Sequence, residues 1–311
     1  MKQKYRITNW RQYDRSLKDR GNVFLYFTPE ALKNWHNTNG WNKGFGRPRR
    51  YSRLAIETCL TIRLLFRLPL RQTEGFIEGI IKQLGLAIQC PDHSLMSIRA
   101  PELERKLKRF SKPKGPIHVL IDSSGLKVYG EGEWKVRTHG KEKRRTWKKI
   151  HITIDSKEKL VLSTEVTKSN VHDCTMVESL LDPIDDIESL KGDGAYDTNG
   201  IYRYLKKRKT KPIIPPRENA VIHKHHSEER NKVVEKIREY GDNEEARKRW
   251  KQEEGYHTRS LVENAFFRRK TILGSNLRSR NDSNQVVEGL LGSHILNKMT
   301  RMGMPVSVRV N

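Results

Sequence analysis

The sequence predicts an α/β protein in which a small all-helical N-terminal domain precedes a domain built on a mixed five-stranded sheet with helices. Apolar residues recur with helical period before residue 110, whereas several later runs alternate between apolar and polar residues. Short helical segments separate the later runs, as in sheets covered by helices. The expected domains are 1–110 and 111–311, with a charged helical insertion at about 216–255.

The N-terminal domain is expected to contain two longer helices. Leucine and isoleucine recur at helical spacing from 54 to 65, and Ser52 is placed to cap that helix. A second helix is expected over about 71–84, because Gly85 follows as a stop signal.

A third, short helix is expected to begin at Asp92 or Ser94 and to end before Pro101. Two helices, a turn and a third helix resemble a helix-turn-helix unit that binds DNA. A helical dimerisation or linker domain is the alternative. The basic, proline-containing segment 104–114 marks the expected domain boundary.

The second domain is expected to begin with a buried strand over Ile117–Asp122 that ends in a carboxylate and a turn. Two strands with alternating polarity are expected next, over Trp147–Asp155 and Leu160–Thr167. They are followed by a helix over 173–181, a short strand that leads to Asp193, a helix over 199–207 and a strand over 212–215.

Two aspartates are expected at strand ends in this domain. Asp122 ends the first strand, and Asp193 lies between Gly192 and Gly194, which allow a close approach of backbone or ligand. If these two carboxylates were brought together with that of Glu263, the three would repel one another unless cations neutralised them. Oxygen ligands favour Mg²⁺ or Mn²⁺ over zinc, and two such ions about 3.5 to 4 Å apart are the usual means of attacking a phosphodiester.

The stretch from Tyr256 to Lys270 contains no proline or glycine and is predicted to be one helix. On such a helix Tyr256, Arg259, Glu263 and Lys270 share one face. The alternative is a surface helix on which Arg259 and Glu263 merely form an i,i+4 ion pair.

The composition indicates a polyanionic partner. The chain has 311 residues, with 62 basic and 37 acidic side chains and a formal charge of +25, for which nucleic acid is the natural partner. No apolar run has the length of a membrane span and no signal-peptide core follows the N-terminus, so we expect a cytosolic protein with no membrane contact. The three cysteines form no CxxC pair, which favours reduced thiols.

A basic run over 134–149 follows the Asp122 strand. It holds eight Lys or Arg residues, one Glu and two tryptophans, so it can neutralise phosphates and offers an indole for stacking on a base. The residues expected to contact DNA here are Trp134, Arg144, Arg145, Lys148 and Lys149. Trp147 could equally belong to the core. The insertion at 216–255 is either a helical arm near DNA or a partner subunit, or a solvated excursion.

The triplet Asp122, Asp193 and Glu263, with the spacing Tyr256-(2)-Arg259-(3)-Glu263-(6)-Lys270, resembles the DDE transposases of bacterial insertion sequences. It is most similar to the IS-five family with its Y-R-E-K signature. Further matching segments are Tyr51–Thr58, Leu70–Glu74, Asp122–Gly125, Gly192–Asp197 and Leu296–Pro305. The resemblance implies an RNase H-like catalytic domain, whose first and fourth strands lie side by side and so join Asp122 to Asp193.

The resemblance also implies a function. Asp122, Asp193 and Glu263 would bind two Mg²⁺ ions, which Mn²⁺ may replace. The enzyme would bind the insertion-sequence ends, cleave them and join the 3′-hydroxyls to target DNA. Arg259 and Lys270 would hold phosphates, and Tyr256 a phosphate or base edge.

The expected partners are the terminal inverted repeats and target DNA, bound by at least a homodimer in the bacterial nucleoid. Two alternatives are another kind of RNase H-like DNA nuclease and a domesticated transposase that only binds DNA.

Overall fold

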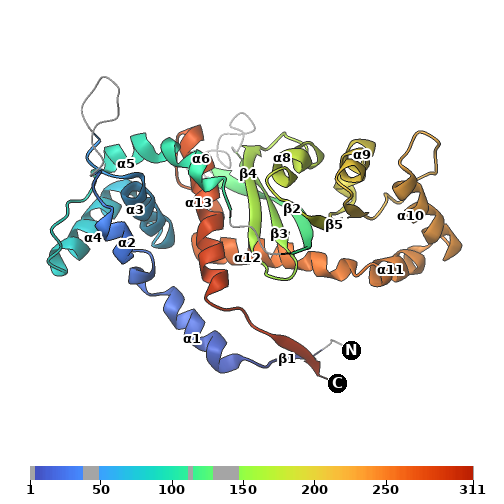
Figure 1. Cartoon of the computed structure of the whole chain (residues 1–311), viewed down its shortest axis with the longest axis horizontal. Coiled ribbons are helices and arrows are strands. Elements are labelled where there is room, and N and C mark those ends of the chain that lie inside the picture. Colours follow the sequence, from blue (N-terminus) through green and yellow to red (C-terminus); the bar gives the residue numbers. More distant parts are fainter. Residues whose placement is uncertain (1–3, 38–48, 111–114, 129–146, 311) are drawn as a thin grey trace, which may run out of the picture. The chain divides into compact units, whose positions relative to one another are not determined.

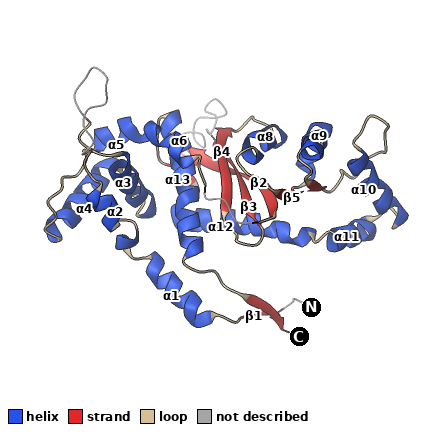
Figure 2. Cartoon of the chain, in the orientation of Figure 1, coloured by secondary structure: helices blue, strands red, loops and turns tan. Residues whose placement is uncertain are grey.

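The chain folds into two compact units in a computed structural model that describes residues 4–37, 49–110, 115–128 and 147–310 (Figure 1). The first unit comprises residues 1–107 together with 281–311, and the second comprises residues 108–280. Each unit has its own secondary-structure class, since helices dominate the first and the large sheet lies in the second (Figure 2).

The first unit is built mainly from helices. They are α1 (Trp10–Arg20), α2 (Pro29–Lys33), α3 (Arg53–Leu65), α4 (Leu70–Gln83), α5 (His93–Arg99), α6 (Glu104–Leu107) and α13 (Asp282–Arg301), with short 3-10 turns η1 (Val23–Leu25) and η2 (Ala100–Leu103). Strands β1 (Lys4–Ile7) and β8 (Ser307–Val310) pair antiparallel.

The predicted helix ends in this unit are confirmed. Ser52 accepts the backbone N–H of Ala55 at 3.1 Å and so caps α3. Asp92, one of the two residues considered, caps α5 by accepting two backbone N–H groups at 2.9 Å. Gly85 follows α4 with a φ of 60°, the left-handed conformation that suits glycine after a helix.

Residues 281–311 differ from the sequence expectation, which placed them in the catalytic domain. Helix α13 instead packs with the N-terminal helices, and buries Leu290, Leu291, Ile295, Leu296 and Met299. Specific hydrogen bonds join its Asn284 side chain to the Ser97 carbonyl at 3.0 Å and its His294 ring to the Leu107 carbonyl at 2.7 Å. Because α13 is buried on most of its faces and mixes apolar with polar residues there, helical periodicity alone did not indicate which core it joins.

The second unit is organised around a mixed sheet. Its described strands are β2 (Ile117–Val128), β3 (Trp147–Asp155), β4 (Val161–Lys168), β5 (Ile187–Lys191), β6 (Lys211–Ile213) and the short β7 (Asn276–Leu277). The order is β4-β3-β2-β5-β6, with β7 beside the far end of β2. Strands β3 and β4 are antiparallel to their neighbours, whereas β5 and β6 run parallel to β2. This is the RNase H-like arrangement, with the first and fourth strands adjacent and one short strand more than expected.

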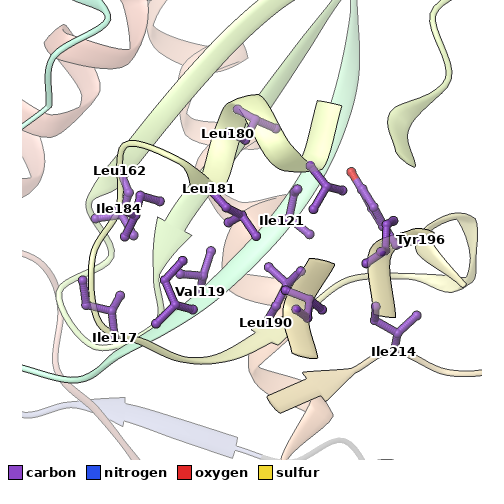
Figure 3. Packing of buried hydrophobic residues seen from close by; sticks show 14 of the residues in the cluster. Ile117, Val119, Ile121, Leu162, Leu180, Leu181, Ile184, Leu190, Tyr196 and Ile214 are labelled. Atoms are coloured by element: carbon purple, nitrogen blue, oxygen red, sulfur yellow. The ribbon is translucent and has the colours of Figure 1, made fainter. Parts of the chain in front are cut away.

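Helices cover both faces of this sheet. They are α8 (Val177–Leu181), α9 (Asn199–Lys207), α10 (Glu228–Glu239), α11 (Glu244–Glu253) and α12 (Ser260–Leu273), with 3-10 turns η3 (Asp173–Met176), η4 (Gly194–Tyr196) and η5 (Tyr256–Arg259). Val119 and Ile121 pack with Leu180, Leu181 and Tyr196 in one core (Figure 3). Since side chains alternate along a strand, the opposite face of β2 presents Asp122 and Ser124, and α12 lies against it.

Asp122 does not end its strand, contrary to expectation. Strand β2 continues through the predicted turn, with Asp122 opposite Ile152 and Gly125 opposite Lys149 on β3. On its other side, the pairing of β2 with β5 stops at Leu120. Long-range pairing with β3 therefore keeps the chain extended, while the end of β5 leaves room beside Asp122.

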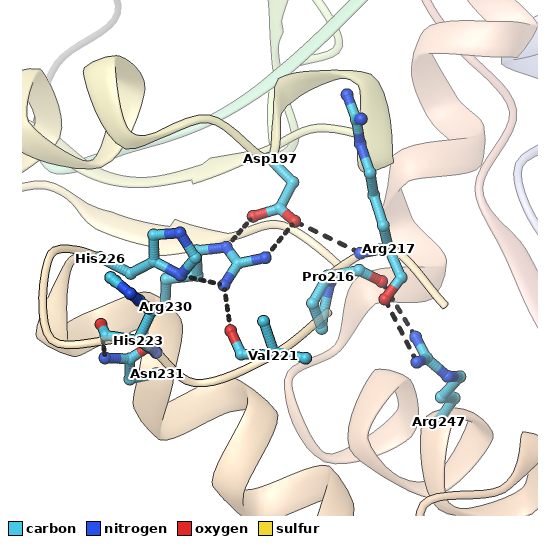
Figure 4. A network of polar contacts seen from close by, with 9 residues as sticks. All are labelled: Asp197, Pro216, Arg217, Val221, His223, His226, Arg230, Asn231 and Arg247. Atoms are coloured by element: carbon cyan, nitrogen blue, oxygen red, sulfur yellow. Dashed lines mark hydrogen bonds and ion pairs between the residues drawn. The ribbon is translucent and has the colours of Figure 1, made fainter. Parts of the chain in front are cut away.

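The insertion is part of the fold and not a solvated excursion. Helices α10 and α11 bury Ile237, Ala246 and Trp250 against Ile213 of β6. A buried ion pair joins Arg230 of α10 to Asp197, which follows η4, with N–H to oxygen distances of 2.8 and 3.1 Å (Figure 4).

Candidate active site

Asp193 is held just beyond the end of β5. Its Oδ1 accepts the backbone N–H of Ala195 at 2.9 Å and so caps the turn η4. The preceding Gly192 lies where the backbone closely approaches other groups, because a Cβ there would be 2.8 Å from the Tyr196 ring and 3.2 Å from Ile121. Glycine at this position lets the chain pass between the core and the carboxylate.

Glu263 lies in α12, which begins later than predicted. The stretch from Tyr256 to Lys270 is not one α-helix, because residues 256–259 form the tighter 3-10 turn η5 after Gly255, whose φ is 59°. The buried face of α12 consists of Val262, Ala265, Phe266 and Arg269. Glu263 lies off this face, and its side chain is 59% exposed.

One guanidinium connects the three predicted carboxylates. Arg259 Nη1 donates to Glu263 Oε1 at 2.6 Å, while Nη2 donates to Asp122 Oδ2 at 3.1 Å and Asp193 Oδ2 at 3.4 Å. The two aspartate oxygens are therefore at most 6.5 Å apart, the sum of their distances to Nη2. Residues separated by 141 positions, from 122 to 263, thus converge on one small site.

Burial opposes the ionisation of side chains in this site. Burial raises the pKa of Asp122 to about 6, and the neighbouring Asp193 and Glu263 add to the rise, while Arg259 and the Ser123 N–H oppose it. Burial also raises the pKa of Tyr256 to about 12, again with Arg259 opposing. The site therefore favours a cation among its carboxylates.

The other two predicted anchors border the same site. Lys270 donates from Nζ to Ser124 Oγ at 2.7 Å, two residues from Asp122 on the same face of β2. The Tyr256 ring packs at a tilt against Trp250 with centroids 6.4 Å apart, and the Lys251 ammonium lies 5.6 Å from its centre.

The donor chemistry of the site fits hard divalent cations. All three side chains offer carboxylate oxygens, the ligands that Mg²⁺ and Mn²⁺ prefer. Arg259 stands in for a metal ion, since its positive charge is shared by the three carboxylates. In this arrangement, no group of three or more His, Cys, Asp or Glu among the described residues is positioned to hold a metal ion.

The structure describes only residues 147–149 of the predicted basic run 134–149. Trp134, Arg144 and Arg145 lie outside the described residues. The Lys148 side chain is buried on β3. The Lys149 ammonium contacts Asp173 at 2.9 Å and the Val171 carbonyl at 2.8 Å.

Sequence reasoning missed a lysine that supports the site. Lys191, the last residue of β5, is buried and donates to the Gly255 carbonyl at 2.7 Å and to Thr258 Oγ1 at 2.9 Å. It thereby fixes the strand that leads to Asp193 against the turn that carries Arg259. Its place directly before Gly192 and Asp193 was the available signal, since a lysine that ends a short buried strand requires a partner.

Among the helices that the structure describes, none is both long and apolar enough to cross a bilayer.

Comparison with known proteins places the chain in a family. A cryo-EM structure of the piggyBac transposase synaptic complex with hairpin DNA is similar at 12% sequence identity, with a TM-score of 0.43 over 89% of this chain and 73% of that chain. A family model described as a transposase DDE domain matches residues 113–297, more than half of the chain, and a second model with the same description matches residues 18–131. The chain therefore belongs to the family of proteins with a transposase DDE domain.

Proposed function

We propose that this protein is a transposase of the IS-five group with the Y-R-E-K signature, and that Asp122, Asp193 and Glu263 are its catalytic residues. It cleaves the ends of its own element and joins the 3′-hydroxyls to target DNA. The observation that carries the proposal is the convergence of the three carboxylates, from β2, the end of β5 and α12, on the guanidinium of Arg259.

Transposases with this domain generally use divalent metal ions. We propose that Asp122, Asp193 and Glu263 would hold two Mg²⁺ ions, which Mn²⁺ could replace; such ions would supply activation of the attacking oxygen and stabilisation of charge on the phosphate. The carboxylates that would hold the ions come from β2, from the turn after β5 and from α12. Lys191 and the Gly192 turn keep Asp193 in place beside Asp122.

Three cationic or polar side chains border the site and suit a DNA backbone. Arg259 and Lys270 are assigned to phosphates near the scissile bond, and Tyr256 to a phosphate or base edge. The formal charge of +25 supports a polyanionic substrate. Contacts from Trp134, Arg144, Arg145, Lys148 and Lys149 stay predictions.

The remaining roles are also proposals. Helices α3 to α5 would bind the terminal inverted repeats, with dimerisation as their alternative role. The protein would act as a homodimer or larger assembly on DNA in the bacterial nucleoid, because two element ends have to be cut together.

Alanine substitution tests the catalytic assignment. In Asp122→Ala, Asp193→Ala and Glu263→Ala, we expect the loss of Mg²⁺-dependent cleavage of DNA carrying the element ends, while binding to those ends persists in gel-shift assays. The matched control is Glu244→Ala on α11, whose carboxylate is 82% exposed and pairs with Lys248. Full activity in any of the three variants would refute the assignment.

The same assay separates the alternatives. Cleavage without joining of the ends to target DNA would indicate an RNase H-like nuclease of another kind. Binding without either reaction in the natural sequence would indicate a domesticated transposase that only binds DNA.

A further inference from the structure

Arg259 makes contacts in the DNA-free structure that binding to a phosphate does not explain. Its two terminal nitrogens contact oxygens of Asp122, Asp193 and Glu263, and its side chain is only 15% exposed. An isolated surface pair with Glu263, four residues along, would leave the guanidinium in solvent. Here the arginine instead lies among the carboxylates.

A metal ion would require the same oxygens. Mg²⁺ binds oxygen ligands at about 2.0 to 2.1 Å in an octahedral shell, so it needs the carboxylate lone pairs that now accept from Arg259. A guanidinium left in contact with those oxygens would also repel a divalent ion. The two cations therefore compete for one site.

Arg259 has an unmet hydrogen-bonding capacity where it lies. Its Nε is buried and has no hydrogen-bond partner among the described residues. A phosphate can accept two parallel N–H groups from one guanidinium, so DNA offers Arg259 an alternative set of acceptors. The η5 turn that carries it is fixed through Lys191, which leaves movement to the arginine side chain.

We propose that Arg259 is an internal counter-cation that closes the carboxylate site of the DNA-free protein and leaves it when DNA and divalent ions bind. The inference rests on the proposed function and adds a regulation of the same site. Before DNA arrives, Arg259 holds the three carboxylates together and opposes the uptake of ions. DNA phosphates attract the guanidinium, so DNA binding and ion binding favour each other. The protein is thereby restrained from loading ions until its substrate is present.

Mn²⁺ binding to the full-length protein without DNA tests this inference. The bound ion is measured by isothermal titration calorimetry and by the loss of the free Mn²⁺ signal in electron paramagnetic resonance. We expect Arg259→Ala and Arg259→Gln to bind Mn²⁺ about tenfold more tightly than the natural protein, or more. Arg259→Lys keeps a positive charge and should bind ions more weakly than Arg259→Ala does.

Lys270→Ala is the matched control, because it also removes one positive charge next to the site without touching a carboxylate in the structure. The gain in Arg259→Ala has to exceed the gain in Lys270→Ala, since the latter measures only the long-range effect of charge. Equal gains, or an unchanged or weaker affinity in Arg259→Ala, would overturn the inference.

Asp122→Ala separates this inference from the proposed function. If Mn²⁺ binds equally to the natural protein and to Arg259→Ala but not to Asp122→Ala, the metal site stands and only the role of Arg259 fails. If Asp122→Ala binds Mn²⁺ as tightly as the natural protein and Arg259→Ala, both the metal site and the inference fail.

Discussion

The buried ion pair that anchors the insertion gives a sharp test of the fold around the site. Asp197 lies four residues after Asp193, and its side chain is 1% exposed. Arg230 donates two N–H groups to it at 2.8 and 3.1 Å, and Arg217 adds its backbone N–H at 3.3 Å (Figure 4). Arg230 also donates to the Val221 carbonyl at 3.1 Å, so it joins α10 to the loop before it.

Arg230→Ala removes one partner and leaves a buried carboxylate without its cation. Removal of one partner of a buried ion pair typically costs about 3 to 5 kcal/mol. In a domain of 150 to 250 residues, each kcal/mol lowers the melting temperature by about 2 to 4 °C, so we expect a decrease of roughly 6 to 20 °C. This is a large part of the about 5 to 15 kcal/mol that stabilises an ordinary domain.

Urea and thermal unfolding of the full-length protein measure this cost. Limited proteolysis at α10 and α11 shows whether the insertion opens first. The control is Arg238→Ala on the same helix. Its side chain is 44% exposed, and its Nε lies 3.9 Å from Asp242 Oδ2, which is too long for a strong ion pair. We expect this control to change the free energy of unfolding by no more than about 0.5 kcal/mol.

A double variant distinguishes an unpaired charge from lost packing. In Asp197→Asn with Arg230→Gln, no buried charge is left unpaired, so we expect a smaller loss than in Arg230→Ala alone. A loss below about 1 kcal/mol in Arg230→Ala, or a double variant that is equally unstable, would refute the reasoning.

Two further predictions concern the site itself. Because the pKa of Asp122 is raised from 3.8 to about 6 in the folded protein, folding takes up a proton between these values, and its contribution to stability is lost as pH rises through this window. Relative to Asp122→Asn, we expect the metal-free natural protein to lose roughly 2 kcal/mol of unfolding free energy between pH 4 and pH 7 in urea titrations. Parallel pH profiles of the two proteins would contradict this. Gly192→Ala places a Cβ 2.8 Å from the Tyr196 ring, so we expect a destabilisation of about 1 to 3 kcal/mol in the same assay. Gly194→Ala is the control, because its Cβ would meet the Pro215 carbonyl at an ordinary 3.6 Å, and equal losses in the two variants would refute the steric argument.

Parts of the site followed from local sequence pattern, and its strand neighbourhood from the family resemblance. Alternating residues predicted strand 147–155, and β3 has those bounds. The pattern predicted the strands alone, and the resemblance to DDE transposases implied that the first and fourth are adjacent, as β2 and β5 are, which brings Asp122 close to Asp193. Helical spacing placed Arg259 and Glu263 within reach of each other, and they form the i,i+4 contact.

Other features depended on contacts between distant segments. Pairing with β3 carried β2 past the turn that Ser123 and Gly125 indicated. Lys191 and Arg230 acquired their roles from partners 64 and 33 positions away. Nothing in the charged sequence around Arg230 distinguishes it from its exposed neighbours.

The sequence by itself determined the type of most helices and strands and several of their caps. These features depend on spacing and on hydrogen bonds between residues close in the chain. The motifs around Asp122, Asp193 and Glu263 marked these residues as candidates through their resemblance to a known family. Only the tertiary structure decided that α13 joins the N-terminal helices, that the insertion docks through Asp197, and that Arg259 contacts all three carboxylates. Burial and charge pairing between residues far apart in the sequence depend on competition among all segments of the chain. A local sequence pattern therefore does not reveal which residues will pair.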